Sequence, residues 1–224
     1  MAVLNPNLLL VEGEDDKRVL VHFMDQFVVW GDKSSEWVVD VKVAGSITEL
    51  LESSFIDNEF TRANLKAVGI VVDANADLKK RWDDVCRKCL KYFPDLPTEL
   101  PNTGIDHSNS DGLRLGIWLM PNNESPGILE SFLATFAIDQ SQGLWPFVNS
   151  YCLDGKAQHA APYKDIHLDK ALIHSWLALQ NPPGQQLHSA FIQRILQPSS
   201  PLAEPFVKWF CELFQVQRRI DSVT

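Results

Sequence analysis

Short apolar runs alternate with segments of helical periodicity in the first part of the chain, up to about residue 138. Four runs of aliphatic and β-branched residues predict strands, at residues 8–11, 37–43, 67–72 and 113–119. Apolar positions three or four residues apart predict helices between them, over 15–27, 47–51 and 78–93. This alternation is typical of βαβ units, so we expect an α/β fold with a mostly parallel, Rossmann-like sheet flanked by helices.

The rest of the chain follows a different pattern. Residues 94–112 are rich in Pro, Asn, Ser, Asp and Gly and predict a long loop. The segment ILESFLATF, residues 128–136, predicts a helix, and the remainder has helical periodicity with breaks at prolines, Pro146 and Pro205 among them. We therefore expect an α/β domain over 1–138 and a helical extension over 139–224, a C-terminal cap packed on it as one compact body.

Charge and composition narrow the function classes. Asp and Glu number 29 against 20 Lys and Arg, a net charge of −9 that opposes non-specific attraction to nucleic acid or anionic lipid. Contact with nucleic acid then needs a local basic patch, a metal or a partner protein. No apolar stretch is long enough for a membrane span and no basic leader precedes one, so we expect a cytoplasmic protein with no membrane contact. Neither a P-loop nor a G-x-S-x-G motif occurs.

The four cysteines are too few to serve as a disulfide scaffold in a chain of 224 residues. Cys86 and Cys89 have C-x-x-C spacing, but they fall deep within a predicted helix and have no second pair nearby. Zinc and redox motifs place such a pair at a turn or a helix start. We therefore expect neither disulfides nor a zinc site.

Acidic residues follow three of the predicted strands. Glu12 ends the first strand, Asp73 ends the third, and Glu130 lies one turn into the helix after the fourth. Ligands of open α/β sheets bind at the carboxyl ends of the strands, and parallel strands place these ends on one edge. Carboxylates brought together repel one another unless a cation neutralises them. The pattern predicts a hard divalent metal, Mg²⁺ or Mn²⁺, at this edge.

Each acid also has a structural interpretation. Glu14, Asp15 and Asp16 fall in the first turn of a helix, where the macrodipole favours acids. In the same way, Asp73 is suited to capping the helix that follows it, and Glu130 to an ordinary first-turn position. Glu12 gains little from capping because it precedes Gly13, which we expect in a tight turn or a close backbone approach.

These residues also carry a resemblance. VEGEDD after a first strand and IVVDANAD after a later one resemble the TOPRIM domain of topoisomerases, DnaG-type primases and OLD-family nucleases. The chain is more closely similar to small stand-alone TOPRIM-like proteins of unknown function. That likeness covers nearly the whole chain, through VEGEDDKRVL, GIVVDANADLKKRW, GIWLMPNNESPGILESFL and LALQNPPGQ.

The resemblance implies roles for the first two motifs. Glu12 corresponds to the family glutamate, a general acid or base or a metal ligand, and Asp16 fits the second acid of an OLD-type E-x-x-x-D pattern. Asp73 corresponds to the first acid of the family's D-x-D. The second is replaced by Asn75, a neutral carbonyl ligand, and Asp77 is the available substitute.

The OLD-type S-x-x-E element occurs as Gly127 to Glu130, which keeps the acid and loses the hydroxyl. The implied site is thus partly degenerate, and an amide in place of a carboxylate weakens Mg²⁺ affinity or excludes one of two ions. The resemblance implies cleavage of nucleic-acid phosphodiester bonds, with Glu12 and Asp73 catalytic. The implied metal ligands are Glu12, Asp16, Asp73, Asn75, Asp77 and Glu130.

Two other functions stay open. A partly degenerate TOPRIM module could dock on a partner ATPase without catalysis, which the net charge and Asn75 favour. A metal-dependent phosphatase with a small substrate would tolerate an acidic surface. Lys80, Arg87 and Lys91 share a face of the predicted helix over 78–93 and are the candidate nucleic-acid contacts, against the alternative of a solvated outer face. The sequence leaves the oligomeric state open.

Overall fold

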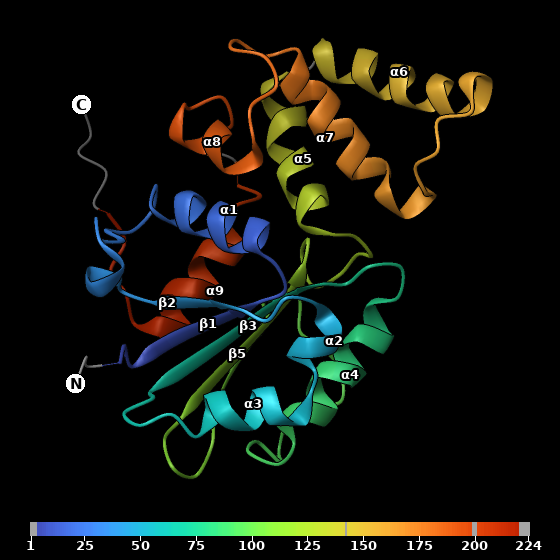
Figure 1. Ribbon diagram of the computed structural model, residues 1–224. Helices are drawn as coiled ribbons and strands as arrows, with labels where there is room; N and C mark the ends of the chain where they lie inside the picture. Colours follow the sequence, from blue (N-terminus) through green and yellow to red (C-terminus); the bar gives the residue numbers. More distant parts are fainter. Residues whose placement is uncertain (1–3, 142, 199–200, 220–224) are drawn as a thin grey trace.

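The computed structural model describes residues 4–141, 143–198 and 201–219 (Figure 1). The first residues of the expected α/β domain and the last residues of the expected helical extension therefore lie outside the described residues. The described residues contain one five-stranded sheet in the order β2-β1-β3-β5-β4. The strands are β1 (Asn7–Val11), β2 (Asp40–Val43), β3 (Ala67–Asp73), β4 (Ile105–Ser108) and β5 (Arg114–Met120). Neighbours among β2, β1, β3 and β5 pair in parallel, and β4 is antiparallel to β5. The predicted α/β class with a mostly parallel sheet is confirmed.

The central strands are apolar on both faces because helices cover both faces of the sheet. In β1, Leu8 and Leu10 belong to the core beneath one face, whereas Leu9 and Val11 belong to the core on the other. All four side chains are fully buried. This two-sided burial explains why β1 has a continuous apolar run rather than alternating polar positions.

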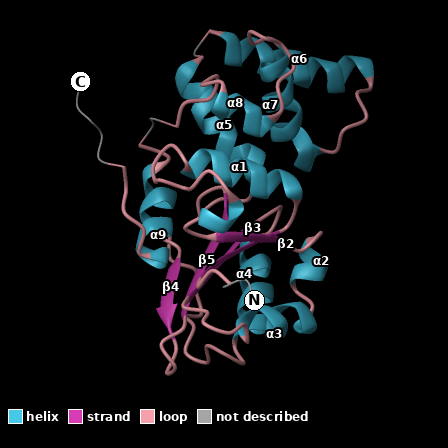
Figure 2. Ribbon diagram, turned by 60° about the vertical axis from the view of Figure 1, so that its left-hand side comes forward, coloured by secondary structure: helices cyan, strands magenta, loops and turns pink. Residues whose placement is uncertain are grey.

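Three helices cover the first face, as Figure 2 shows. They are α2 (Ile47–Leu50), α3 (Ser53–Phe60) and α4 (Leu78–Cys89). The inner side of α4 presents Trp82, Val85 and Cys89, which are buried one turn apart. Basic and acidic residues occupy its outer side, so α4 is an amphipathic helix whose N-terminus follows directly from the end of β3.

The opposite face is covered by α1 (Glu14–Met24) and α9 (Glu204–Phe214). Two glycines let α9 approach the sheet closely. A Cβ atom on Gly116 of β5 would lie 2.2 Å from Cδ2 of Leu213, and one on Gly69 of β3 would lie 2.9 Å from Cζ of Phe214. The final helix of the expected C-terminal extension therefore packs directly on the sheet.

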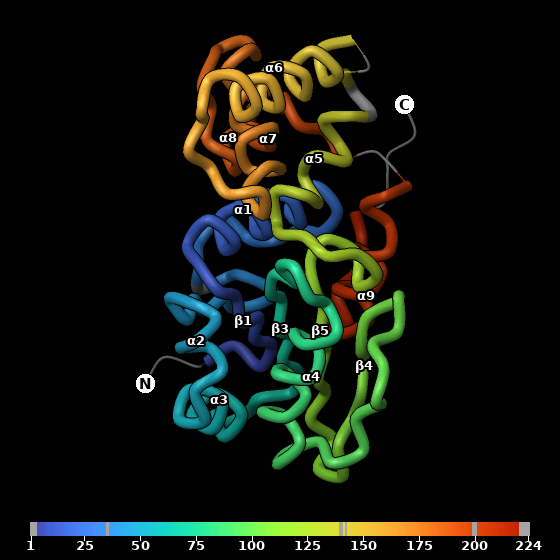
Figure 3. Tube along the Cα trace, turned by 90° about the vertical axis from the view of Figure 1, so that its right-hand side faces the viewer, coloured from blue at the N-terminus to red at the C-terminus, as the bar shows by residue number. Residues whose placement is uncertain are grey.

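Those preceding helices form a cap above α1, which Figure 3 shows from the side. The cap consists of α5 (Leu129–Gln140), α6 (Leu144–His159), α7 (Leu168–Ala178) and α8 (Leu187–Ile192). Phe23 of α1 packs against aromatic rings of the cap and of α9. Its ring centroid lies 5.3 Å from that of Phe132, 5.7 Å from that of Phe191 and 5.8 Å from that of Phe206. One hydrophobic core thus continues from the sheet face into the cap.

Several sequence-based boundaries were wrong. Residues 94–112 contain β4, a four-residue strand whose Ile105 pairs with Ile117. The helix α3 was not predicted. Pro146 and Pro205 do not break helices but lie in the first turns of α6 and α9, where a missing N–H is tolerated. β4 escaped prediction because only its first residue is buried, and its regular structure depends on pairing with β5.

Two further sequence expectations concern the membrane and the cysteines. No helix in the described ranges has the length and apolarity needed to cross a membrane. All four cysteines are free thiols. Burial raises the pKa of Cys86 to about 12 and raises that of Cys89 as well, which disfavours the thiolates that zinc or redox chemistry requires.

The close approach of α9 to the sheet generates a stability prediction. Replacing Gly116 with Ala should destabilise the fold by about 1–3 kcal/mol, because the new methyl overlaps Leu213 in a packed core. Gly155→Ala is the matched control: it lies inside α6, its new Cβ would find open space to 4.0 Å, and alanine favours helix. Urea unfolding of both variants measures the difference. Equal stabilities would contradict the packing described for α9.

Candidate functional site: an acid cluster beneath the helical cap

The ends of β1 and β3 meet at one edge of the sheet. Val11 pairs with Val71 in the parallel register, so the residues that follow each strand emerge side by side. Glu12 follows β1, and its Oε1 accepts a hydrogen bond of 2.9 Å from the backbone N–H of Asp73. This contact holds the carboxylate of Glu12 at the end of β3, as the parallel-strand argument predicted.

Asp73 is linked in turn to the start of the cap. Its Oδ1 accepts a 2.8 Å hydrogen bond from the backbone N–H of Leu129, the first residue of α5. Asp73 therefore does not cap α4, the helix that follows it in sequence. The bond brings the next residue, Glu130, to the same edge, where Glu130 is only 5% exposed.

Asp16 has the helix-start role weighed for it and also lies near the other acids. It is the third residue of α1, and its Oδ2 accepts a 2.9 Å hydrogen bond from the backbone N–H of Gly13, which satisfies a donor at the helix start. A Cβ on Gly13 would lie 3.0 Å from this oxygen, so glycine permits the approach. Glu14 and Asp15 are exposed in the same turn, as first-turn acids usually are.

The pKa values of these acids indicate that their charges interact, so we treat the acids as one group. Burial, reinforced by the charges of Asp16, Glu12 and Glu130, raises the pKa of Asp73 from its ordinary 3.8 to about 8, although the Leu129 N–H opposes the rise. Burial, followed by the charge of Glu12, raises the pKa of Asp16 to about 6. The pKa of Glu12 is also raised by burial, against the Asp73 N–H and the charge of Arg81. Raised pKa values of this kind indicate that the carboxyl groups are buried close together, so that they resist being ionised at the same time.

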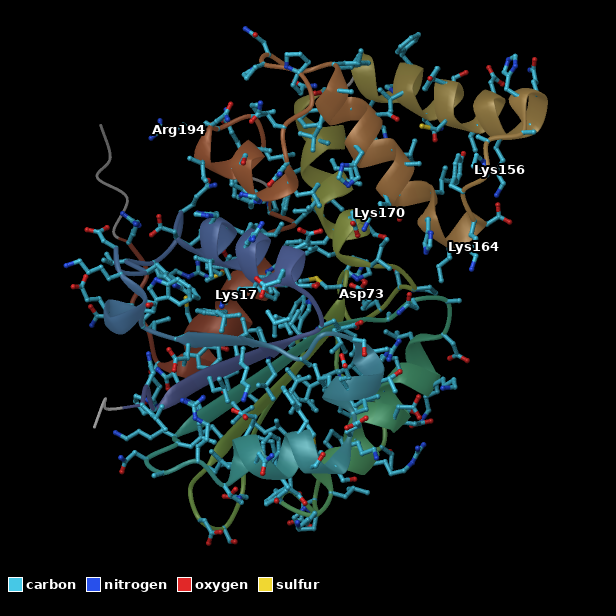
Figure 4. The ribbon with its side chains drawn as sticks, viewed as in Figure 1. Lys17, Asp73, Lys156, Lys164, Lys170 and Arg194 are labelled. Atoms are coloured by element: carbon cyan, nitrogen blue, oxygen red, sulfur yellow. The ribbon has the colours of Figure 1, made fainter. Side chains whose placement is uncertain are left out.

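The cap contributes a cation to this group. Lys170 of α7 lies 2.8 Å from Oε1 of Glu130, and Figure 4 shows it above Asp73. The hydrogen bond to Glu130, with smaller contributions from the charges of Asp15 and Asp73, raises the pKa of Lys170. A neighbouring contact from Ser131 Oγ to Asp169 ties α5 to α7. Sequence reasoning missed Lys170 because nothing in its local sequence distinguishes it from any solvated helix lysine.

Asn75 and Gly127, the two positions where the sequence differs from the TOPRIM pattern, both have a positive φ. Asn75 has φ +57°, in the left-handed region that asparagine tolerates better than most residues. Its N–H and C=O pair with those of Gly127 at 2.7 and 2.8 Å, which joins the loop after β3 to the loop before α5. A Cβ on Gly127 would lie 2.8 Å from Oγ of Ser131, and Gly127 has φ +152°. Serine does not fit at this position.

The remaining predicted residues lie outside the acid group. Asp77 is exposed and caps α4, where its Oδ1 accepts a 2.8 Å hydrogen bond from the N–H of Lys80. The three basic residues predicted on the helix over 78–93 are all paired with aspartates, and Lys91 lies just beyond the end of α4. Lys80 lies 2.7 Å and Arg87 3.2 Å from Asp84, and Lys91 lies 2.9 Å from Asp57. These ion pairs reduce the positive charge that the outer face of α4 offers to nucleic acid.

The donor chemistry of the group fits a hard divalent cation. Glu12 and Asp73 each use one oxygen for a backbone amide, which leaves the other oxygen outside these bonds. A cation among four mutually repelling carboxylates would relieve the repulsion. In the present arrangement, no three acidic, histidine or cysteine side chains of the described residues are gathered as a metal site. An ion held by these acids would therefore need their side chains to rearrange.

The raised pKa of Asp73 predicts how stability depends on pH. An acid whose pKa is higher in the folded state binds its proton more tightly there, so stability falls as pH rises from about 4 to about 8. Asp73→Asn removes that charge and should be more stable than the wild type at pH 8, with a shallower pH dependence. Urea unfolding in chelator-treated buffer at pH 5 and pH 8 measures both. Parallel pH profiles of the two proteins would contradict the strained acid group.

Comparison with known proteins places the chain in a family. Residues 6–215 match the family described as "Protein of unknown function (DUF3226)". Neither a curated protein nor a solved structure gives a match. The matched region begins just before β1 and ends just after α9, so it includes the sheet, the cap and all four acids of the group. The chain therefore belongs to the DUF3226 family.

Proposed function

We propose that the protein is a Mg²⁺- or Mn²⁺-dependent enzyme of TOPRIM-like type that cleaves phosphodiester bonds of nucleic acid. The observation that carries the proposal is the acid group at the sheet edge, where Asp73 has its pKa raised to about 8 by burial and by three neighbouring carboxylates. Perturbed acids of this kind concentrate at functional sites, since a stable fold has no need of them. The cytoplasmic location expected from the sequence is part of the proposal.

The residues that would hold the metal are Glu12, Asp16, Asp73 and Glu130. The bound ion would polarise a phosphoryl oxygen and offset the charge that develops there. Asn75 and Asp77 have no place in this ligand set, because Asn75 joins two loops through its backbone and Asp77 caps α4. The ligand set is therefore smaller than the six residues expected from the sequence.

Glu12 is the residue we assign to proton transfer. Its Oε1 is fixed by the Asp73 N–H, so its orientation is set by the sheet, and its second oxygen is available to a water or hydroxyl. Burial raises the pKa of Glu12, and a higher pKa makes a carboxylate a stronger general base. Asp73 is the other residue we assign to catalysis, as a ligand that would hold the ion.

A second candidate is supported by the contact between Lys170 and Glu130. The ammonium of Lys170 already supplies a positive charge to the acid group. A protein that uses this lysine in place of a metal would be a non-catalytic module that docks on another protein, such as an ATPase. The paired basic residues of α4 and the net charge of −9 favour this candidate over a nucleic-acid enzyme.

Cleavage assays separate the candidates. Purified protein is incubated with supercoiled, linear and single-stranded DNA, with RNA, and with p-nitrophenyl phosphate, in Mg²⁺ and in Mn²⁺. We expect cleavage of a nucleic acid, and a rate at least about 100-fold lower in Glu12→Ala and Asp73→Ala, because each removes a group that acts on the reaction. Hydrolysis of the small ester alone would instead identify a phosphatase.

Asp77→Ala is the matched control for Asp73→Ala. Both remove an aspartate from the segment between β3 and α4, but Asp77 only caps the helix. The control should lose about 1 kcal/mol of stability and keep the wild-type cleavage rate. Cleavage that survives in Glu12→Ala and Asp73→Ala would refute the site. No cleavage of any substrate by the wild type would favour the docking module.

A further inference from the structure

A small cavity lies beside the acid group on the side of α4. Its volume is about 270 Å³, and it lies between the loop after β3, the first turns of α4 and Ile166 of the cap. Ala74 and Asn75, the two residues after Asp73, form part of its wall. Part of the cavity wall therefore follows Asp73 directly in the sequence. The cavity has room only for a compact chemical group.

Arg81 is the unusual residue of this cavity. It lines the wall, and its Nε is buried without a hydrogen-bond partner. None of the ion pairs among the described residues includes Arg81. A guanidinium is always charged and carries five donors, so a buried N–H without an acceptor carries a desolvation cost that a bound anion would remove.

The other charged side chains that line the cavity already have hydrogen-bond or ion-pair partners. Asp84 is paired with Lys80 and Arg87, and Asp77 accepts from the N–H of Lys80. Of the described residues that line the cavity, Arg81 is the cation without an ion pair, although its charge lowers the pKa of Glu12. This position lies between the proposed catalytic carboxylate and the cavity.

We propose that Arg81 and this cavity form a phosphate-binding subsite that holds a phosphoryl group of the substrate beside the acid group. The planar guanidinium donates two parallel hydrogen bonds to phosphate oxygens, a geometry that a lysine does not reproduce. The inference rests on the proposed function for the identity of the substrate. It also explains how an acidic protein attracts a polyanion: the attraction is local to one half-buried arginine.

Arginine Nε–H resonances provide a direct test, with inorganic phosphate as the probe. In metal-free buffer, one such resonance of ¹⁵N-labelled protein should shift saturably as phosphate is added at constant ionic strength. That resonance should be missing from Arg81→Lys, whose phosphate affinity should be at least about fivefold weaker, since it keeps the charge but loses the fork. Arg87→Lys is the matched control on the same helix, because Arg87 is exposed and paired with Asp84, and it should bind phosphate as the wild type does.

The possible results separate this inference from the proposed function. No saturable shift in the wild type, or unchanged phosphate affinity in Arg81→Lys with its thermal unfolding intact, would overturn the subsite. Phosphate binding that depends on Arg81 would uphold it even if no substrate is cleaved, in which case only the proposed function fails. Cleavage with an unchanged KM in Arg81→Lys would overturn the subsite and leave the function standing.

Discussion

Repulsion among buried carboxylates is the constraint on which the rest of the site depends. Burial and three neighbouring acids raise the pKa of Asp73 to about 8, so the protein keeps a group that opposes its own folding at neutral pH. Hydrogen bonds from the backbone amides of Asp73, Leu129 and Gly13 hold three of the four carboxylates in place despite that repulsion. In the function proposed here, a bound cation would offset this cost.

The sheet and the cap build the site together. Parallel pairing of β1 with β3 brings Glu12 and Asp73 to one edge, and α5 begins at that edge and continues into the cap. Helix α7 of the cap comes back to the same edge and places Lys170 against Glu130. Phe23 packs against aromatic rings from both parts, so the cap shares a hydrophobic core with the sheet face. The acid group therefore lies at a junction between two layers rather than on an open surface.

Local patterns were enough to predict the acids but not their partners. Glu12 and Asp73 were predictable because a strand end is visible in the sequence and parallel strands end on one edge. Lys170 and Arg81 were not, since the contact of Lys170 with Glu130 and the buried Nε of Arg81 arise only from tertiary packing. The sequence did not show that Asn75 has a positive φ and joins two loops through its backbone. It also did not show that β4 pairs with β5 despite its polar sequence.

The central claim, that the acid group binds a divalent cation, is tested most directly by thermal unfolding with Mn²⁺ at pH 7.5. Binding to the folded state alone should raise the Tm of the wild type by roughly 5 °C at saturating Mn²⁺. The shift should disappear in Glu12→Gln and in Asp73→Asn, which remove ligand charge with little change of shape. A wild-type Tm that Mn²⁺ leaves unchanged, or an equal shift in both variants, would contradict the account.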